Sequence, residues 1–395
     1  MASNLQYNDL ITTTALPDSI RTIYSAELDY TAAPLMVFDQ FAERKTEHAM
    51  QHGQTAVWSI IRQMPPTIGT LQETVDVDTQ QIQDFQVQMS VYEYGNAVGT
   101  TEKLNLLSYW GPISDIVKRQ LAPQMARTFD IIARNVAWAG ATKRYAGAAT
   151  SRSTLTDADV ATVDLLKQSA HKLRNNRIMP RDGGYVCVAH PSVIYDLRED
   201  PLWEDAGRYA DPSRLATGEV GRLFGVRFVE SDWARLPNAG TSSAQTTLSG
   251  AHSFNSSVLS VASASGFAVG DEITLFASGQ STPDGTGTTE ENVIIKDIDG
   301  NDLTLEYATS IAHANGDKVR KGVDVFPMMF LGHEDPYGKS IVQAPEVRVA
   351  LPTDKLRRFH YVGWYALLGY GVLRDWSYLV VEAAASQSSS YIFGF

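Results

Sequence analysis

The sequence predicts an α+β protein of several domains, in which a small all-β domain is inserted into a larger mixed one. Three observations support this prediction. The chain has 395 residues, 44% hydrophobic and 20% charged, a composition typical of globular proteins and a length that suits two or three lobes. Helical and strand-like segments alternate over residues 112–237. Residues 238–322 instead contain short strands separated by turn residues.

Residues 1–45 are the first expected element. They show little periodicity, and only brief helical stretches are indicated after Pro17 and Pro34. A segment with so little pattern does not build a core by itself. We therefore expect an extended arm that finds its contacts elsewhere, on another subunit.

Residues 46–111 are expected to form a long β-hairpin with a polar, acidic tip. A strand-like run over 57–64 stops at Pro65 and Pro66, and the following segment alternates apolar and polar residues. The apolar members of this alternation are Val75, Val77, Phe85, Val87, Met89 and Val91. An isolated hairpin is only marginally stable, so this one needs a surface to lie on.

Two helices are expected next. The first lies around 113–146, with Pro123 in a first turn or at a kink. The second is expected to begin at Thr156, where Asp159 forms a variant of the capping box, and to end near Asn175. The apolar stripes are Met125, Phe129, Ile132 and Val136 in the first helix and Val163, Leu166, Ala170 and Leu173 in the second.

Residues 182–237 are expected to alternate short strands and short helices. Strands are predicted at 185–189 and 226–230, with a helix begun by Pro191 and another short helix from Gly218. The same mixed character resumes after residue 322 and ends in long, aromatic-rich strands followed by a short tail.

Residues 238–322 differ sharply in composition, being rich in Ser, Thr, Gly and Asp. Turns are indicated by Gly270-Asp271, by Asp299-Gly300-Asn301 and by Gly316-Asp317. Between them lie five short strand-like runs at 256–263, 271–278, 291–298, 302–309 and 317–323. This pattern favours a small β-barrel or sandwich over a long irregular loop.

Charge and cysteine content narrow the classes of function. The net charge of −12 opposes a protein that grips nucleic acid, because such proteins need a surplus of Lys and Arg. It does not oppose a container for DNA, because an acidic wall keeps packed duplex from sticking to it. Cys187 is the only cysteine, so no intrachain disulfide and no cysteine zinc cluster can form, which is compatible with a reducing cytoplasm. Neither a secretory signal nor a membrane-spanning run is expected.

One motif resembles a phosphate-binding loop. The segment Gly332–Ser340 follows a predicted strand, but five residues instead of four separate its glycines, and two of the five are acidic. Acidic side chains would repel phosphate, so a tight turn at Gly338 is the preferred interpretation. Cys187 and His190 lie three apart near a strand, on opposite faces, which opposes a thiolate–imidazole pair.

A second motif, Asp297–Asp302, resembles the start of a calcium loop. The glycine comes two places early, and Ala308 stands where a bidentate Glu is required. A hairpin turn is therefore the preferred interpretation. The eight histidines show no metal-ligand spacing. No catalytic, cofactor-binding or metal-ligating residue is predicted, and no cofactor is expected.

Residues 182–231 resemble the central block of the coliphage N-four-like major capsid proteins. The similar elements are GGYVCVAHP, DLRED, YADP and GEVGRLFGVRFVE. Shorter similar pieces are TTALPDSIRTIYSAELDY near the start, KLNLLSYWGPISD before the long helix and MFLGHEDPYG near residue 335. The resemblance covers most of the chain outside residues 238–322.

The resemblance implies a Hong Kong 97-type phage capsid fold and a structural protein. It implies a subunit that assembles as hexamers and pentamers into an icosahedral shell around double-stranded DNA. The implied parts are an N-terminal arm (1–45), an extended loop (46–111), a peripheral domain with the spine helix (112–155), an axial domain (156–237), the inserted β-domain (238–322), an axial return (323–345) and peripheral strands with a tail (346–395). The further partners that the resemblance implies are a cement protein, a scaffold and a portal.

Two other functions remain open from the sequence. One is a different virion protein of the tail tube or of a decoration layer, which the insertion alone would suit. The other is a nucleotide-binding enzyme that uses Gly332–Ser340 or Cys187.

Overall fold

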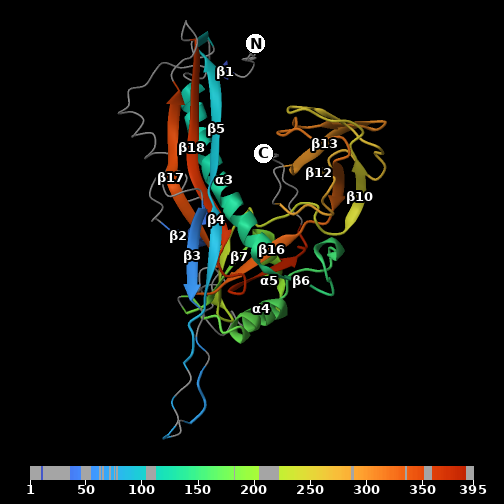
Figure 1. Ribbon diagram of the computed structural model, residues 1–395. Coiled ribbons are helices and arrows are strands. Elements are labelled where there is room, and N and C mark those ends of the chain that lie inside the picture. The colour runs from blue at the N-terminus through green and yellow to red at the C-terminus, as the bar shows by residue number, and fades with distance from the viewer. Residues whose placement is uncertain are drawn as a thin grey trace, which may run out of the picture. The chain divides into compact units, whose positions relative to one another are not determined.

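The computed structural model describes residues 10–11, 36–45, 55–61, 64, 66–70, 73–74, 76, 79–103, 113–181, 183–203, 222–285, 289–333, 336–350 and 358–387. The chain divides into two compact units (Figure 1). Unit 1 comprises residues 1–133 and 337–373, and unit 2 comprises residues 134–336 and 374–395. No helix within the described residues is long and apolar enough to cross a membrane.

Unit 1 is built on a five-stranded sheet. Its order is β1 (Leu10–Ile11), β5 (Tyr92–Thr101), β18 (Phe359–Val372), β17 (Tyr337–Ala350) and β2 (Glu43–Lys45). The three long central strands are antiparallel, whereas the short edge strands β1 and β2 pair in parallel. The N-terminal segment thus contributes both edges, although it has no apolar periodicity of its own.

Helix α3 (Ile113–Gly140) lies along this sheet (Figure 1), and its residues between Val117 and Phe129 contribute buried side chains to the shared core. Its buried side chains include Met125 and Phe129, and the Phe129 ring meets the Trp364 ring edge-on with centroids 5.4 Å apart. Pro123 lies inside the helix and not in its first turn. The helix ends six residues before the expected 146, because strand β6 (Thr142–Tyr145) begins there.

Strands β3 (Thr55–Ile61) and β4 (Asp84–Ser90) form the expected hairpin, paired in register from Thr55↔Ser90 to Ile61↔Asp84. Its base packs Trp58 and Met89 against Leu373. Gly369 lets the hairpin approach β18 closely, since a Cβ there would lie 2.2 Å from the Ser90 carbonyl oxygen. Val75 and Val77 lie outside the described residues.

The main sheet of unit 2 has six strands. Its order is β6, β19 (Tyr378–Ala383), β16 (Phe326–Leu331), β7 (Tyr185–Ala189), β9 (Val226–Glu230) and β8 (Arg222–Leu223). Alternate residues of these strands pack against α4 (Val163–Asn175) and α5 (Pro191–Glu199), which cover one face. The predicted strands at 185–189 and 226–230 and the helix begun by Pro191 are confirmed.

Helix α4 begins at Val163, and the prediction of a start at Thr156 is wrong. Thr162 is the N-cap residue, and its hydroxyl accepts a hydrogen bond from the Leu165 amide. Asp159 instead closes a turn, because its Oδ2 accepts hydrogen bonds from both the amide and the hydroxyl of Thr156. Capping-box residues close a turn as readily as they begin a helix.

The helix predicted from Gly218 is not present where the structure describes this segment. Arg222 and Leu223 form strand β8, followed by a turn in which Phe224 and Gly225 both have positive φ angles of 49° and 81°. Residues 204–221 lie outside the described residues.

The C-terminal strands do not follow the expected division into an axial return (323–345) and peripheral strands (346–395). They alternate between the two units. Within the expected axial return, β16 belongs to the sheet of unit 2, but β17 begins at Tyr337 in the sheet of unit 1. Within the expected peripheral strands, β19 returns to unit 2 and pairs with β16 and β6. All six residues of β19 are buried, and a strand buried on both faces belongs in the interior of a covered sheet.

The insertion forms a closed six-stranded antiparallel barrel around a core of its own. The order is β10 (Ser242–Thr247), β15 (Lys318–Gly322), β12 (Glu272–Phe276), β13 (Glu291–Asp299), β14 (Asp302–Leu305) and β11 (Val258–Ser260). A bridge between Leu248 and Val261 joins the two outer strands and closes the sheet. The sequence did not predict strand β10. Its buried residues are Ala244 and Thr246, so the strand contains no apolar run that would have indicated it.

Candidate functional site

The segment Gly332–Ser340 is not a phosphate-binding loop. Gly338, Lys339 and Ser340 lie inside β17 and pair with β18, so no helix N-terminus follows the last glycine. The Lys339 ammonium is 2.5 Å from the Asp39 carboxylate. The lysine that would hold a phosphate therefore already has an anionic partner.

Cys187 and His190 occupy structural positions. Cys187 is completely buried in β7, and this burial raises the pKa of its thiol. His190 is the N-cap of α5, where its Nδ1 accepts a hydrogen bond from the Ser192 amide at 3.1 Å. Burial, and then the charge of Arg235, lower the pKa of His190 to about 4. The His190 imidazole is therefore neutral and caps helix α5, and the Cys187 thiol is not ionised.

The Asp297–Asp302 motif is the turn of the β13–β14 hairpin. Asp299 pairs with Asp302 across the turn, and Gly300 has a φ angle of 62°. In the ranges that the structure describes, no three His, Cys, Asp or Glu side chains gather in a way that could hold a metal ion.

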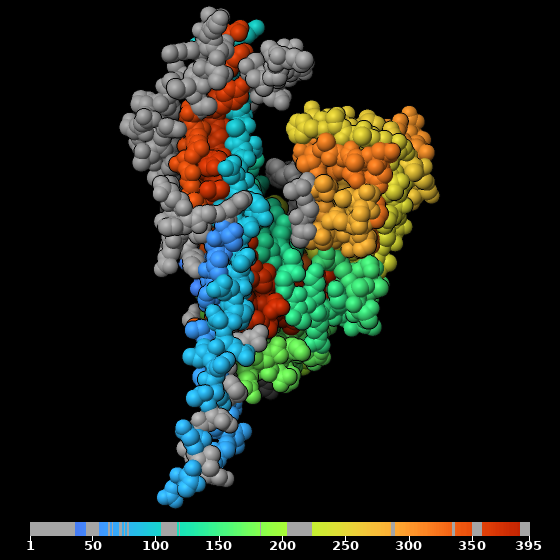
Figure 2. Space-filling view, viewed as in Figure 1, coloured from blue at the N-terminus to red at the C-terminus, as the bar shows by residue number. Residues whose placement is uncertain are grey.

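The outer part of the β3–β4 hairpin exposes large apolar side chains. Ile61, Met64, Ile68 and Ile82 are 68%, 51%, 90% and 67% exposed. Figure 2 shows the hairpin, coloured blue, as a narrow projection. Isolated exposed apolar residues are ordinary, but four of them along one projection favour a contact surface for another protein.

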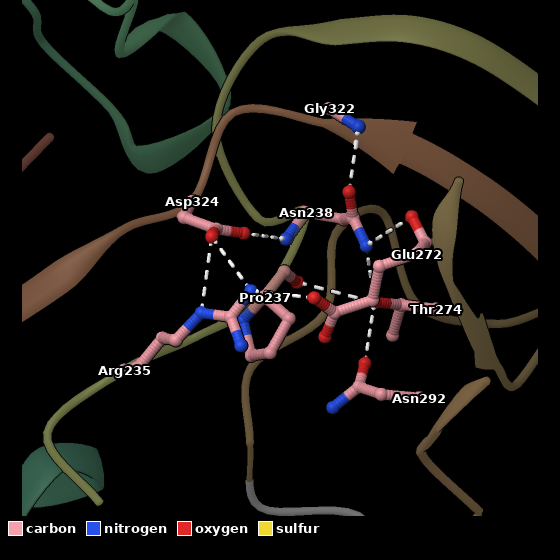
Figure 3. Close-up of polar contacts among 8 residues, drawn as sticks. All are labelled: Arg235, Pro237, Asn238, Glu272, Thr274, Asn292, Gly322 and Asp324. Atoms are coloured by element: carbon pink, nitrogen blue, oxygen red, sulfur yellow. Dashed lines mark hydrogen bonds and ion pairs between the residues drawn. The ribbon is translucent and has the colours of Figure 1, made fainter. Parts of the chain in front are cut away.

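The junction between the barrel and its parent sheet is a buried polar network (Figure 3). Leu236 and Val325 form an antiparallel bridge, so the two ends of the insertion lie side by side. Arg235 donates to Asp324 through Nε at 3.0 Å and through Nη2 at 2.7 Å, and Nη2 also contacts Glu272 of the barrel at 2.8 Å. A guanidinium removed from water is stable only with such partners.

Asn238 lies at the centre of this network. Its amide donates to Asp324 Oδ1, its side-chain oxygen accepts from the Gly322 amide, and its side-chain nitrogen donates to Thr274 Oγ1, each at 2.9 Å (Figure 3). Its φ angle of 54° is in the left-handed region, which Asn tolerates better than most residues. Asn238 thus ties the first residue of the insertion to the last one and to β12.

A second attachment is made by the segment between β12 and β13. Arg134, near the end of α3, donates to the Gly285 carbonyl at 3.1 Å and to the Trp233 carbonyl at 2.8 Å. Arg152 donates to the Pro283 carbonyl at 3.2 Å while it forms a two-point ion pair with the buried Glu382. The barrel is therefore attached to the rest of unit 2 at two separate places.

Sequence reasoning could not have found these contacts. They join residues 36 to 230 positions apart, as in Asn238–Thr274 and Arg152–Glu382, and none of the residues belongs to a motif. The one available signal was the composition change near Pro237, which indicates where the insertion begins but not how it is held.

Comparison with protein families gives one match. A family model described as "Phage capsid protein" matches residues 114–290, which run from α3 into the barrel. No curated protein matches the chain.

Solved structures give many matches. The capsid of cyanophage P-SCSP1u is 13% identical, with 89% of each chain covered and a TM-score of 0.55. The capsid of Helicobacter pylori bacteriophage KHP30 is 10% identical, covering 95% of this chain and 94% of that one, with a TM-score of 0.53. The capsid of cyanophage Pam1 is 12% identical, covering 98% and 99%, with a TM-score of 0.52. The α+β Hong Kong 97-type fold is thereby confirmed.

Proposed function

We propose that this chain is a phage capsid shell subunit, the major capsid protein, which assembles with copies of itself as hexamers and pentamers into an icosahedral shell. The match to the phage capsid family and the capsid fold over almost the whole chain support this function. It is a structural protein, and we propose no enzymatic activity for it.

The observation that carries self-assembly is the exposed hairpin. In its outer part, Ile61, Met64, Ile68 and Ile82 are exposed to water, whereas at its base Trp58 and Met89 pack within unit 1. Burying one Ile side chain stabilises an interface by about 1.5–3 kcal/mol. Repeated over many copies, such contacts add up to a stable shell.

We propose that the chain belongs to the coliphage N-four-like branch of these capsid proteins, on the strength of residues 182–231. In the vocabulary of the fold, the arm and extended loop are residues 1–45 and 46–111. The sheet of unit 1 with α3 is the peripheral domain, and the sheet of unit 2 with α4 and α5 is the axial domain. The barrel at 238–322 projects from the outer surface, because its Ser-, Thr- and acid-rich composition suits solvent.

The proposed shell encloses double-stranded DNA without sequence-specific binding, which the net charge of −12 favours. The subunit is made in the host cytoplasm and ends in the virion. A cement protein, a scaffold and a portal are its proposed additional partners.

Electron microscopy of the purified full-length protein tests this function. Closed shells or capsomers are expected, formed by this chain alone or with a scaffold. Particles in the form of tubes or single monomers under all assembly conditions, with scaffold supplied, would contradict it.

A further inference from the structure

Unit 1 contains a buried cluster of ionisable side chains that the proposed shell function does not require. Lys339 of β17 lies with its Nζ 2.5 Å from Oδ2 of Asp39, and their side chains are only 16% and 11% exposed. Asp39 begins a short 3-10 helix, Asp39–Phe41, just before β2. The pair joins residues that are 300 positions apart.

Neighbouring groups hold Asp39 in place. Asp130 of α3 is fully buried, and its Oδ1 accepts hydrogen bonds from the amides of Val37 and Asp39 at 2.9 and 3.0 Å. The Tyr337 hydroxyl donates to the Phe38 carbonyl at 2.5 Å. The Ala42 amide donates to the Asp39 carbonyl at 3.2 Å. The backbone on both sides of Asp39 is therefore held by hydrogen bonds, which favours one orientation of its carboxyl group toward Lys339. Reactions accelerate when reacting atoms are held at contact distance in this way.

Two further groups suit bond formation between them. The Tyr370 hydroxyl donates to Oδ1 of Asp39 at 2.6 Å, and burial, followed by the charge of Asp39, raises the pKa of Tyr370 well above its usual value. Tyr370 therefore remains a donor that can stabilise negative charge on Oδ1. Burial raises the pKa of Asp130 to about 6, and its Oδ2 is buried without a hydrogen-bond partner among the residues that the structure describes. Asp130 can therefore carry a proton near neutral pH.

We propose that Lys339 and Asp39 form an intrachain isopeptide bond. Nζ of Lys339 attacks Cγ of Asp39, the new bond is Nζ–Cγ, and the bond that breaks is Cγ–Oδ2. Two of the three ammonium protons pass to Oδ2, which leaves as water, and the third remains on the amide nitrogen. Asp130 relays these protons, and Tyr370 stabilises the tetrahedral intermediate. No oxidant or other reactant is needed.

A second lysine pair provides a contrast. Lys321 lies 2.7 Å from Asp271 in the barrel, but its side chain is 34% exposed, and the described contacts place no tyrosine hydroxyl or second carboxyl on Asp271. This pair has the features of an ordinary surface ion pair. The bond at Lys339 would link the end of the N-terminal arm covalently to β17. It would survive unfolding, whereas an ion pair would not.

Intact mass spectrometry of the denatured full-length chain tests the proposal. The wild type is expected to be lighter than its sequence by one water molecule, and proteolysis should release one linked peptide that contains both Asp39 and Lys339. Lys339→Arg keeps the charge but not the nucleophile, so it should have its full sequence mass. Lys321→Arg, the matched control, should show the same loss as the wild type.

The proposal is overturned if the wild type has its full sequence mass, if Lys339→Arg still lacks one water, or if the linked peptide involves other residues. In Asp130→Asn, the side-chain oxygen still accepts hydrogen bonds from the two amides but the group cannot relay a proton, so a large unlinked fraction is expected. Asp130→Glu restores an acid and should have a smaller unlinked fraction than Asp130→Asn. Complete linkage in Asp130→Asn would overturn the proton relay assigned to Asp130.

Discussion

Arg235 and Asp324 form a buried ion pair, with 2.7 Å between Nη2 and Oδ2, that joins the chain entering the barrel to the chain leaving it. Both side chains are less than 10% exposed. The same carboxylate accepts the Asn238 amide through its other oxygen. Asp324 therefore closes the base of the insertion with both of its oxygens.

Asp324→Ala is expected to lower the free energy of unfolding of unit 2 by about 3 kcal/mol. This is the lower end of the cost of breaking a buried ion pair, because Glu272 remains beside Arg235. Asp299→Ala, at the exposed β13–β14 turn, should change stability by less than about 0.5 kcal/mol. Urea unfolding measures both variants. Equal stability of the two would show that the ion pair does not hold the junction.

Replacing residues 238–322 by a short Gly-Ser linker is expected to leave unit 2 folded but less stable. The core beneath the main sheet contains no residue of the barrel. The guanidinium groups of Arg134 and Arg235, however, would each lose a barrel partner, and a lost hydrogen bond to a charged group costs about 1.5–3 kcal/mol. Circular dichroism and urea unfolding measure the change. An insoluble or unfolded product would place the barrel inside the folding core.

Removing the apolar groups of the hairpin should block assembly without unfolding the subunit. The triple variant Ile61→Thr, Ile68→Ser and Ile82→Ser changes side chains that are at least 67% exposed, so stability should change little. A loss of about 2 kcal/mol per contact would raise the concentration needed for assembly more than tenfold. Light scattering and electron microscopy measure assembly.

The matched control for the hairpin variant is Phe254→Ser with Val269→Ser, two exposed apolar residues of the barrel. The control should assemble at the wild-type concentration. In wild-type shells, the amides of 55–61 and 84–90 should also exchange hydrogen more slowly than in free subunits. Normal assembly of the triple variant would remove the hairpin from the interface.

The shell is expected to lack covalent links between subunits through the extended loop. Residues 53–100 contain no lysine, since Lys45 and Lys103 lie outside them, so this segment has no amine for an amide bond to a neighbour. Boiled particles should run as one monomer band on a denaturing gel. A ladder of multimers is the contrary result, whereas an intrachain bond would leave the single band.

Glu290 should make the barrel less stable as the pH rises through about 7. Burial raises the pKa of Glu290 to about 7, although its oxygens accept the amides of Asp284 and Gly285. A group with a raised folded-state pKa contributes its full stability below its unfolded pKa and loses it as the pH rises through the folded value. With allowance for partial exposure, the loss is about 1–3 kcal/mol.

Glu290→Gln isolates this effect, because the amide side chain does not ionise. The stability difference between the wild type and the variant should move in favour of the variant between pH 5 and pH 8. Urea unfolding at several pH values measures it. A difference that is constant across this range would show that Glu290 is not protonated in the folded protein.

The sequence by itself determined strands, turns and the buried face of α4 wherever local periodicity was strong. In α3, Met125 and Phe129 are buried as predicted, but Ala133 and Ala137 are buried in place of Ile132 and Val136. Tyr185–Ala189 and Val226–Glu230 lie as predicted, because their apolar runs have few alternatives to a buried strand. The turn at Gly300 followed from the need for a positive φ angle. The resemblance in residues 182–231, together with the patterns along the chain, was sufficient for the capsid fold.

Tertiary structure alone decided which sheet each strand joins and which polar groups meet. Strand β17 mixes polar and apolar residues and β19 is a mostly apolar run, but neither pattern indicates which sheet the strand joins, because partner choice depends on burial by distant segments. The contacts of Asp324 with Arg235, Arg152 with Glu382 and Lys339 with Asp39 have no local signature. Such pairs are stable only when folding brings them together and removes water from them, and this condition cannot be read from neighbouring residues.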